Sequence, residues 1–252
     1  MLAAHSLDVS VTDRRLVDAL SFVAARGEFA CLLGANGAGK SLTLHTLAGL
    51  RAPSGGEVTL GGRRLAEWPR RERARTLGLL TQVTEDPFPG TVLDAVLVGR
   101  HPHLELWQWE GAADLEVARA ALAQCDLAGF EQRAIDTLSG GERRRVALAA
   151  VLAQDPDVLL LDEPHNHLDP HHQLEVLHLL RARADQGRAV LATLHDPTLA
   201  ARFTDRVLLL FGDGRWVYGP TAEVLTAESL SAIYRVQMRE HLVEGRRVFL
   251  SD

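Results

Sequence analysis

The feature that most constrains this chain is a glycine-rich loop directly after an apolar run. The sequence GANGAGKS at residues 34–41 follows the apolar residues 29–33, and leucines at helical spacing begin at Leu42. Three glycines permit backbone angles that side chains forbid, so that successive N–H groups can surround a polyphosphate at the start of a helix. Lys40 adds a positive charge for the outer phosphates, and the Ser41 hydroxyl suits Mg²⁺. The pattern predicts a strand, loop and helix that bind nucleotide phosphates, although a glycine-rich turn with an incidental lysine is an alternative.

The predicted phosphate contacts are all residues from 34 to 42 except Ala35. They are Gly34, Asn36, Gly37, Ala38, Gly39, Lys40, Ser41 and Leu42.

Composition narrows the class of protein. With 252 residues, of which 46% are hydrophobic, the chain can bury the core of one large or two modest domains. A net charge of −6 lacks the basic bias of a nucleic-acid binder, and we expect the arginines within 70–75 and 143–145 to be solvated helix faces.

Cys31 and Cys125 have no metal-type spacing, which predicts reduced thiols, with Cys31 a small core residue. The first residues resemble no signal peptide, and no apolar run approaches ~18 residues, so we expect neither secretion nor a membrane span.

The first third of the chain has strand patterns. Residues 6–11 alternate apolar and polar side chains, residues 58–65 predict a hairpin around Gly61-Gly62, and residues 76–81 form another apolar strand. From 85 to about 155, after the break at Pro87-Phe88-Pro89-Gly90, helical spacing replaces alternation. This middle segment is predicted to be a helical insertion.

Strands and helices alternate again after the insertion. Strands are predicted at 158–161 and 189–194, and each is followed by a helix that starts with an Asp-Pro pair. Such alternation implies a parallel sheet with crossover helices. Residues 207–218 predict a further hairpin, and the remaining tail is expected to be mostly helical.

Two carboxylates end the apolar strand at 158–161. Ligands of open parallel sheets lie beyond the carboxyl ends of the strands, so Asp162 and Glu163 are expected beside the phosphate loop. Asp162 can hold Mg²⁺, and Glu163 can accept a proton from the water that attacks the terminal phosphate. Solvated acids at a strand end are the alternative.

A second potential anion site precedes the helical stretch 143–153. Its residues Ser139, Gly140 and Gly141 combine a hydroxyl with free N–H groups at a helix start. An ordinary serine-capped helix is the alternative, and the combination with the loop and the carboxylates argues against it.

With these motifs in place, the chain resembles the ATP-binding subunits of ATP-binding cassette (ABC) transporters over nearly its whole length. The matching pieces stand in the family's order: Walker A at 34–41, the Q-loop glutamine Gln82, the signature at 138–142, Walker B at 158–163, the D-loop at Leu168-Asp169 and the H-loop histidine His195. The resemblance implies an α/β fold, namely a P-loop NTPase (RecA-like) core with an inserted α-helical subdomain and an N-terminal antiparallel β part.

The resemblance also implies domain limits and roles. The core would comprise 1–84 and 156–225, the helical subdomain 85–155 and a C-terminal tail 226–252. The implied cofactors are ATP and Mg²⁺; the implied catalytic residues are Glu163, His195, Gln82 and Lys40, and the implied metal ligands are Ser41, Gln82 and Asp162.

Family partners follow in the same way. The resemblance implies a head-to-tail homodimer in which Ser139, Gly140 and Gly141 of one subunit close on ATP held by the other. It further implies a separate membrane permease dimer, indirect contact with a substrate-binding protein, no nucleic acid, and a place on the cytoplasmic face of the inner (plasma) membrane.

Three departures from the family pattern are visible. Val11 stands where an adenine-stacking aromatic residue is usual, which predicts weaker base stacking. Histidines occupy 165, 167, 171 and 172 around the D-loop, where a metal site is conceivable although the sequence pairs them with no carboxylate. Trp107 and Trp109 are expected to pack within the helical subdomain, or alternatively to face a partner.

The leading hypothesis is the ATPase of an importer. The segment 96–102 and the surroundings of His195 resemble importers of iron–siderophore, haem or cobalamin, and residues 107–110 favour cobalamin slightly. A soluble ABC ATPase acting on nucleic acid or ribosomes, an exporter cassette and a switch that does not hydrolyse ATP are alternatives. A single cassette and acidic charge argue against the first, while Glu163 and His195 argue against the last.

Overall fold

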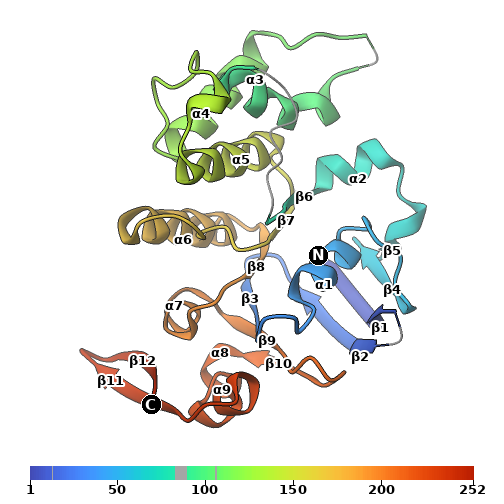
Figure 1. Cartoon of the computed structure of the whole chain (residues 1–252). Coiled ribbons are helices and arrows are strands. Elements are labelled where there is room, and N and C mark those ends of the chain that lie inside the picture. Colours follow the sequence, from blue (N-terminus) through green and yellow to red (C-terminus); the bar gives the residue numbers. More distant parts are fainter. Residues whose placement is uncertain (13, 83–89, 106) are drawn as a thin grey trace.

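A six-stranded sheet forms the centre of the molecule. The computed structural model describes residues 1–12, 14–82, 90–105 and 107–252 (Figure 1). The strand order is β10-β9-β3-β8-β7-β6, parallel from β9 to β6, with β10 antiparallel at one edge. The strands are β3 (Phe29–Gly34), β6 (Leu77–Leu80), β7 (Val158–Leu161), β8 (Ala189–Thr193), β9 (Arg206–Leu210) and β10 (Trp216–Pro220). The predicted parallel sheet is confirmed.

Successive residues of the central strands belong to two different hydrophobic cores. On β3, Phe29, Cys31 and Leu33 join one cluster, whereas Ala30 and Leu32 join the other. Side chains alternate across a strand, and both faces of a parallel sheet are covered, so every position of such a strand is apolar. This is why these strands read as continuous apolar runs, and it confirms Cys31 as a core residue.

An antiparallel sheet covers one of these cores. Its order is β2-β1-β4-β5, with the strands β1 (Leu2–Val11), β2 (Arg14–Ala24), β4 (Gly55–Leu60) and β5 (Arg63–Arg64). The predicted hairpin around Gly61-Gly62 is present, since β4 pairs with β5 in antiparallel fashion. Both glycines have the positive φ that its tight turn requires. Leu65 starts a short 3₁₀ helix instead of extending the strand.

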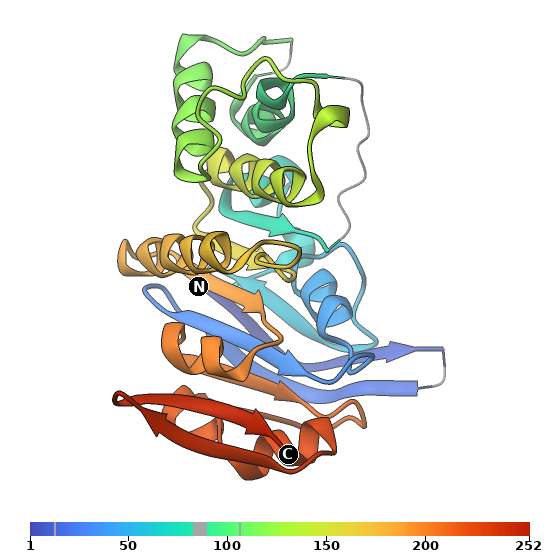
Figure 2. The ribbon, with the colours of Figure 1, turned by 60° about the vertical axis from the view of Figure 1, so that its left-hand side comes forward.

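The helices lie in two groups (Figures 1 and 2). Those around the sheets are α1 (Lys40–Leu47), α2 (Arg70–Thr76), α6 (Pro170–Asp185), α7 (Pro197–Phe203), α8 (Thr221–Val224) and α9 (Ala227–Tyr234). Those in the inserted segment are α3 (Val92–Leu97), α4 (Ala112–Gln124) and α5 (Gly140–Gln154). Within the described ranges, the 3₁₀ helices are Leu65–Glu67, Val98–His103 and Ile135–Thr137. The predicted chain break at 87–89 and the domain limit at 84/85 touch residues outside the described ranges.

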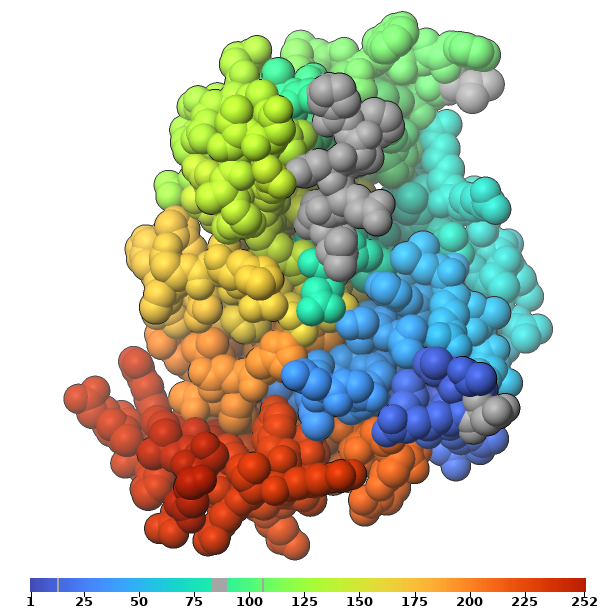
Figure 3. Space-filling view, in the orientation of Figure 1, coloured from blue at the N-terminus to red at the C-terminus, as the bar shows by residue number. Residues whose placement is uncertain are grey.

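The prediction of a mostly helical tail is wrong for its last part. After α9, strands β11 (Met238–Val243) and β12 (Arg246–Ser251) form a hairpin, which protrudes in red at one side of Figure 3. Glu244 and Gly245 both have positive φ, which matches the tight turn that joins two antiparallel strands. The Glu-Gly turn, with Val243 before it and Val248 in the following strand, outweighs the helical pattern upstream.

In the part of the chain that the structure describes, no helix is long and apolar enough to cross a bilayer.

Candidate active site

The glycine-rich loop lies between β3 and α1, as predicted. Gly37 and Gly39 have φ of 77° and 98°, and Gly39 caps the start of α1. A side chain at Gly34 would place its Cβ 2.7 Å from the backbone oxygen of Leu210. Glycine is therefore required at 34 for close packing against β9, and at 37 and 39 for backbone angle.

Lys40 is the only charged side chain of the loop, and it is buried. Its Nζ donates hydrogen bonds to the backbone oxygens of Gly34 at 2.8 Å and Ala35 at 3.2 Å. Burial lowers the pKa of the Lys40 ammonium, while the carboxylates of Glu163 and Asp162 act in the opposite direction. Lys40 therefore lies between its own loop and the two acids that end β7.

Asp162 is fully buried at the end of β7. Thr193, the last residue of β8, donates from Oγ1 to Asp162 Oδ1 at 2.7 Å and accepts a hydrogen bond from the Glu163 N–H at 2.7 Å. Among the described residues, Asp162 Oδ2 is buried without a hydrogen-bond partner. A buried carboxylate oxygen without a hydrogen-bond partner is rare, because leaving it unpaired costs folding free energy. Carboxylate oxygens are also ligands that Mg²⁺ prefers.

The Glu163 carboxylate is hydrogen-bonded to three side chains from three parts of the chain. Gln82 Nε2 donates to Oε2 at 3.0 Å, Asn166 Nδ2 donates to the same oxygen at 2.7 Å, and His195 Nε2 bonds to Oε1. Burial opposes the ionisation of Glu163, but the hydrogen bond and charge of His195, together with the Asn166 hydrogen bond and the charge of Lys40, hold its pKa below the usual value. The predicted Gln82, Glu163 and His195 are thus in direct contact, and Asn166 joins them.

Arg144 reinforces the same region from α5. This side chain is only 5% exposed, and its guanidinium donates to the backbone oxygens of Thr81, Asp162 and Glu163. The sequence prediction that Arg143 to Arg145 are a solvated helix face is wrong for Arg144 and Arg145, since both are buried. A guanidinium carries five N–H donors, so Arg144 can bind several backbone oxygens that follow β6 and β7 at once. By contrast, Arg70, Arg71 and Arg75 are exposed on α2, as predicted, whereas Arg73 is half-buried.

The signature segment forms the start of α5 in the helical part of the molecule. Ser139 caps the helix: its Oγ accepts from the Glu142 N–H at 3.2 Å, and Glu142 Oε2 accepts from the Ser139 N–H at 2.7 Å. Ser139 and Gly140 are exposed, and Figure 1 places the start of α5 in the upper part of the molecule, whereas the glycine loop at α1 lies lower. Both groups offer an anion the positive end of a helix.

A family model described as ABC transporter matches residues 17–166, which is more than half of the chain. The chain belongs to the ABC transporter family. As a member, it is an ATP-binding cassette with ATPase activity, and its fold is that of the family.

Individual relatives of this ABC ATPase match it over all or nearly all of its length. A protein of Pseudomonas fluorescens named hemin import ATP-binding protein HmuV is 40% identical over 258 residues, covering 100% of both chains. A protein of the same name from Gloeobacter violaceus is 41% identical over 244 residues, covering 94% of this chain and 88% of the relative. The solved structure of a metal-chelate type ABC transporter in an inward-facing conformation has a TM-score of 0.86 at 28% identity, covering 100% of this chain and 97% of the other.

Two departures of this ABC ATPase from the family pattern concern exposed residues. Val11 ends β1 with 39% of its surface exposed, and Arg14, at the start of β2, donates to the Gly212 oxygen at 2.8 Å. The expectation that Trp107 and Trp109 pack within the helical subdomain is wrong: they are 92% and 86% exposed. They lie beyond the end of the 3₁₀ helix Val98–His103. The alternative that they face a partner stays a prediction.

The histidines around the D-loop separate into different environments. His165 is buried, His167 and His171 are exposed, and His172 contacts the carboxylate of Asp169. The sequence missed three residues that support the acids, namely Asn166, Thr193 and Arg144. Asn166 lies three residues after Glu163, so that a sequence signal existed, whereas Thr193 and Arg144 come close only through the sheet and α5.

Proposed function

We propose that this chain is the ATP-hydrolysing subunit that energises haem import through a separate permease. The observation that carries the proposal is the match over the whole of both chains to a protein named for hemin import, at 40% identity. The structural neighbour of metal-chelate type supports the same class of cargo. The relatives favour haem over the cobalamin and iron–siderophore alternatives, including the slight preference for cobalamin drawn from residues 107–110.

The site residues have complementary tasks in this proposal. The backbone of Gly34 to Gly39 surrounds the phosphates, and Lys40 exchanges its loop carbonyls for the outer phosphate oxygens. Ser41, Asp162 and Gln82 would hold Mg²⁺, which neutralises phosphate charge; the unsatisfied Asp162 Oδ2 fits that role.

Glu163 is the base in this proposal. Its lowered pKa keeps it ionised near neutral pH, so that it can accept a proton from a water placed near the outer phosphate. Gln82, Asn166 and His195 hold the carboxylate in one orientation. In this proposal His195 would also contact the outer phosphate.

Two copies of the chain complete the sites in this proposal. The start of α5 offers Ser139, Gly140 and Gly141 at the surface of the helical part, away from the chain's own loop. In a head-to-tail homodimer this segment closes on the ATP of the other chain. The division into a core at 1–84 and 156–225, a helical subdomain at 85–155 and a tail from 226 is part of the same proposal.

Coupling to transport requires further chains. A permease dimer carries the haem, a binding protein delivers it from the other side, and this chain works at the cytoplasmic face of the membrane. Because its charge is acidic, the proposal includes no nucleic acid.

The test is ATP turnover by the complex with its native permease in lipid. We expect a haem-loaded binding protein to raise turnover, and cobalamin-loaded or iron–siderophore-loaded protein to leave it unchanged. The same complex with Lys40→Ala should show no stimulation by any cargo, because the phosphates lose their charged partner. Healthy basal turnover that responds to cobalamin or siderophore alone would refute the haem assignment, and turnover that responds to no cargo would refute import.

A further inference from the structure

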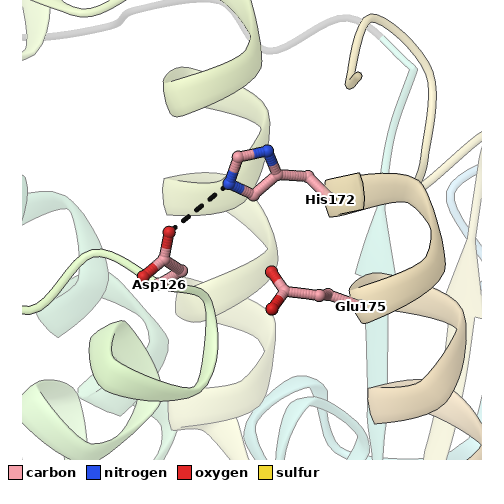
Figure 4. A group of neighbouring side chains, drawn as sticks. All are labelled: Asp126, His172 and Glu175. Carbon is pink, nitrogen blue, oxygen red and sulfur yellow. Dashed lines mark hydrogen bonds and ion pairs between the residues drawn. The ribbon is translucent and has the colours of Figure 1, made fainter. Parts of the chain in front are cut away.

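A histidine and two carboxylates meet between the helical part and the core, outside the ATP site (Figure 4). One ligand atom from each of Asp126, His172 and Glu175 lies within 4.8 Å of the others. His172 Nε2 is 3.4 Å from Asp126 Oδ2. Asp126 follows α4, whereas His172 and Glu175 lie one turn apart on α6, so the group joins two segments that are distant in sequence.

A fourth side chain fixes the orientation of the imidazole. Asp169, the N-cap of α6, accepts a hydrogen bond from His172 Nδ1 at 2.6 Å. With its proton on Nδ1, the ring directs the lone pair of Nε2 toward Asp126 and Glu175. Histidines that bind metals usually have their second nitrogen held in this way by a carboxylate.

Arg145 balances part of the negative charge. Its Nη1 is 3.3 Å from Asp126 Oδ2 and also donates to the backbone oxygens of Cys125 and Asp126, at 3.1 Å and 2.8 Å. These two carbonyls continue to accept hydrogen bonds from Nη1 if the carboxylate turns to another partner. Asp126 is therefore free to exchange one weak contact for a cation.

We propose that Asp126, His172 and Glu175 bind one divalent transition-metal ion of the Zn²⁺ or Mn²⁺ class. One imidazole and two carboxylates suit such ions, and water completes the coordination because Asp126 and Glu175 are exposed. The sequence alone does not pair His172 with Asp126, since Asp126 is 46 residues away and approaches it only where the segment at the end of α4 lies beside α6 in the folded chain.

The ion would connect the helical part to the core. Figure 3 shows the two surfaces adjoining, and Arg183 Nη2 on α6 already donates to Gln124 Oε1 at 2.6 Å. An ion bound by Asp126 and by two residues of α6 would stabilise the arrangement of the helical part and the core in which all three ligands meet. The proposed function requires the start of α5 to close on the ATP of a second chain. On that basis, a metal ion that fixes the helical part against the core slows ATP turnover.

The first experiment is calorimetric titration of Zn²⁺ into the full-length, EDTA-treated chain without nucleotide. We expect one ion per chain, and His172→Ala and Asp126→Asn should each weaken its binding ~10-fold or more. His241→Ala, which removes an exposed histidine on β11, is the matched control and should bind as the wild type does. Circular dichroism confirms that each variant is folded. Wild-type chain that binds no Zn²⁺ at 100-fold excess over protein, or equal affinity in all four proteins, would overturn the site.

A second experiment tests the restraint. One equivalent of Zn²⁺ should lower ATP turnover of the wild type at saturating Mg²⁺-ATP, but leave His172→Ala at its metal-free rate. Equal inhibition of both proteins would overturn the restraint, as would Zn²⁺ that binds the wild type and leaves its turnover unchanged. The binding experiment uses neither ATP nor haem, so its result is independent of the proposed importer function.

Discussion

At the scale of single residues, Glu163 is held in place more firmly than its neighbours in the chain. Its φ of 50° is strained for a residue with a side chain, and its carboxylate receives hydrogen bonds from Gln82, Asn166 and His195. Such strain persists only where the surroundings impose it. The carboxylate is thus fixed in advance at the edge of the sheet beside Lys40, where a base must be rigid to act.

Replacing Glu163 with glutamine tests the proposed base. Glu163→Gln should retain ATP affinity and lose ~10²-fold or more of turnover, because an amide cannot accept the proton of the attacking water. The measurement pairs steady-state phosphate release with equilibrium binding of a fluorescent ATP analogue. Glu223→Gln, an exposed acid on α8, is the control and should be unaffected. Turnover near that of the wild type would remove Glu163 from the mechanism.

His165 predicts a pH dependence of stability. Burial lowers its pKa from 6.5 to about 4, so the folded state disfavours the imidazolium. Its contribution is fully present above pH 6.5 and is lost as the pH falls toward 4. Between pH 7 and pH 5 the free energy of unfolding should fall by about 2 kcal/mol more in the wild type than in His165→Gln.

Urea denaturation at the two pH values measures this difference. His241→Gln removes an exposed histidine and should keep the pH dependence of the wild type. Identical pH dependence in His165→Gln and the wild type would show that His165 does not titrate in this way.

At the scale of elements, α5 joins the signature segment to the strand ends that carry the acids. The helix starts at the exposed Ser139 cap, and within two turns Arg144 binds carbonyls at the ends of β6 and β7. We therefore expect a displacement of the start of α5 to be transmitted through Arg144 to the backbone of Asp162 and Glu163. The element is rigid enough for this purpose, since 15 residues of continuous helix are packed on α3 and α4.

Truncation of Arg144 tests this connection. Arg144→Ala should cost roughly 1–3 kcal/mol in the free energy of unfolding, because buried carbonyls lose their donor. It should also lower kcat by roughly 10-fold to 100-fold with little change in KM, since the acids shift while the phosphate loop is intact. Arg119→Ala, an exposed arginine on α4, should change neither quantity. A rise in KM with kcat unchanged would place Arg144 in substrate binding instead.

The elements also show what the sequence could and could not predict. The runs at 29–33, 158–161 and 189–194 were assigned correctly, because burial on both faces leaves an unmistakable apolar pattern. Burial of Arg144 and Arg145 could not be predicted, since a helical arginine shows its partners only in the folded chain. The terminal hairpin was missed because its exposed strands lack clear alternation, and only the Glu244-Gly245 turn signals it.

At the scale of the whole molecule, the parallel sheet brings the separate motifs to one edge. The loop after β3, the acids after β7 and His195 after β8 all follow the carboxyl ends of neighbouring strands. This convergence was predictable from motif order alone. The roles of these residues and the domain limits stay predictions. The weaker stacking of adenine that Val11 implies is likewise still a prediction.

In the proposed function, two chains share their ATP sites. Light scattering on a sizing column measures directly whether the protein forms this dimer. Glu163→Gln with Mg²⁺-ATP should elute at twice the mass of one chain, and at the mass of one chain without nucleotide. Adding Ser139→Arg, which places a bulky side chain at the start of α5, should abolish the dimer while ATP remains bound. A single-chain mass for Glu163→Gln with ATP demonstrably bound would contradict the account.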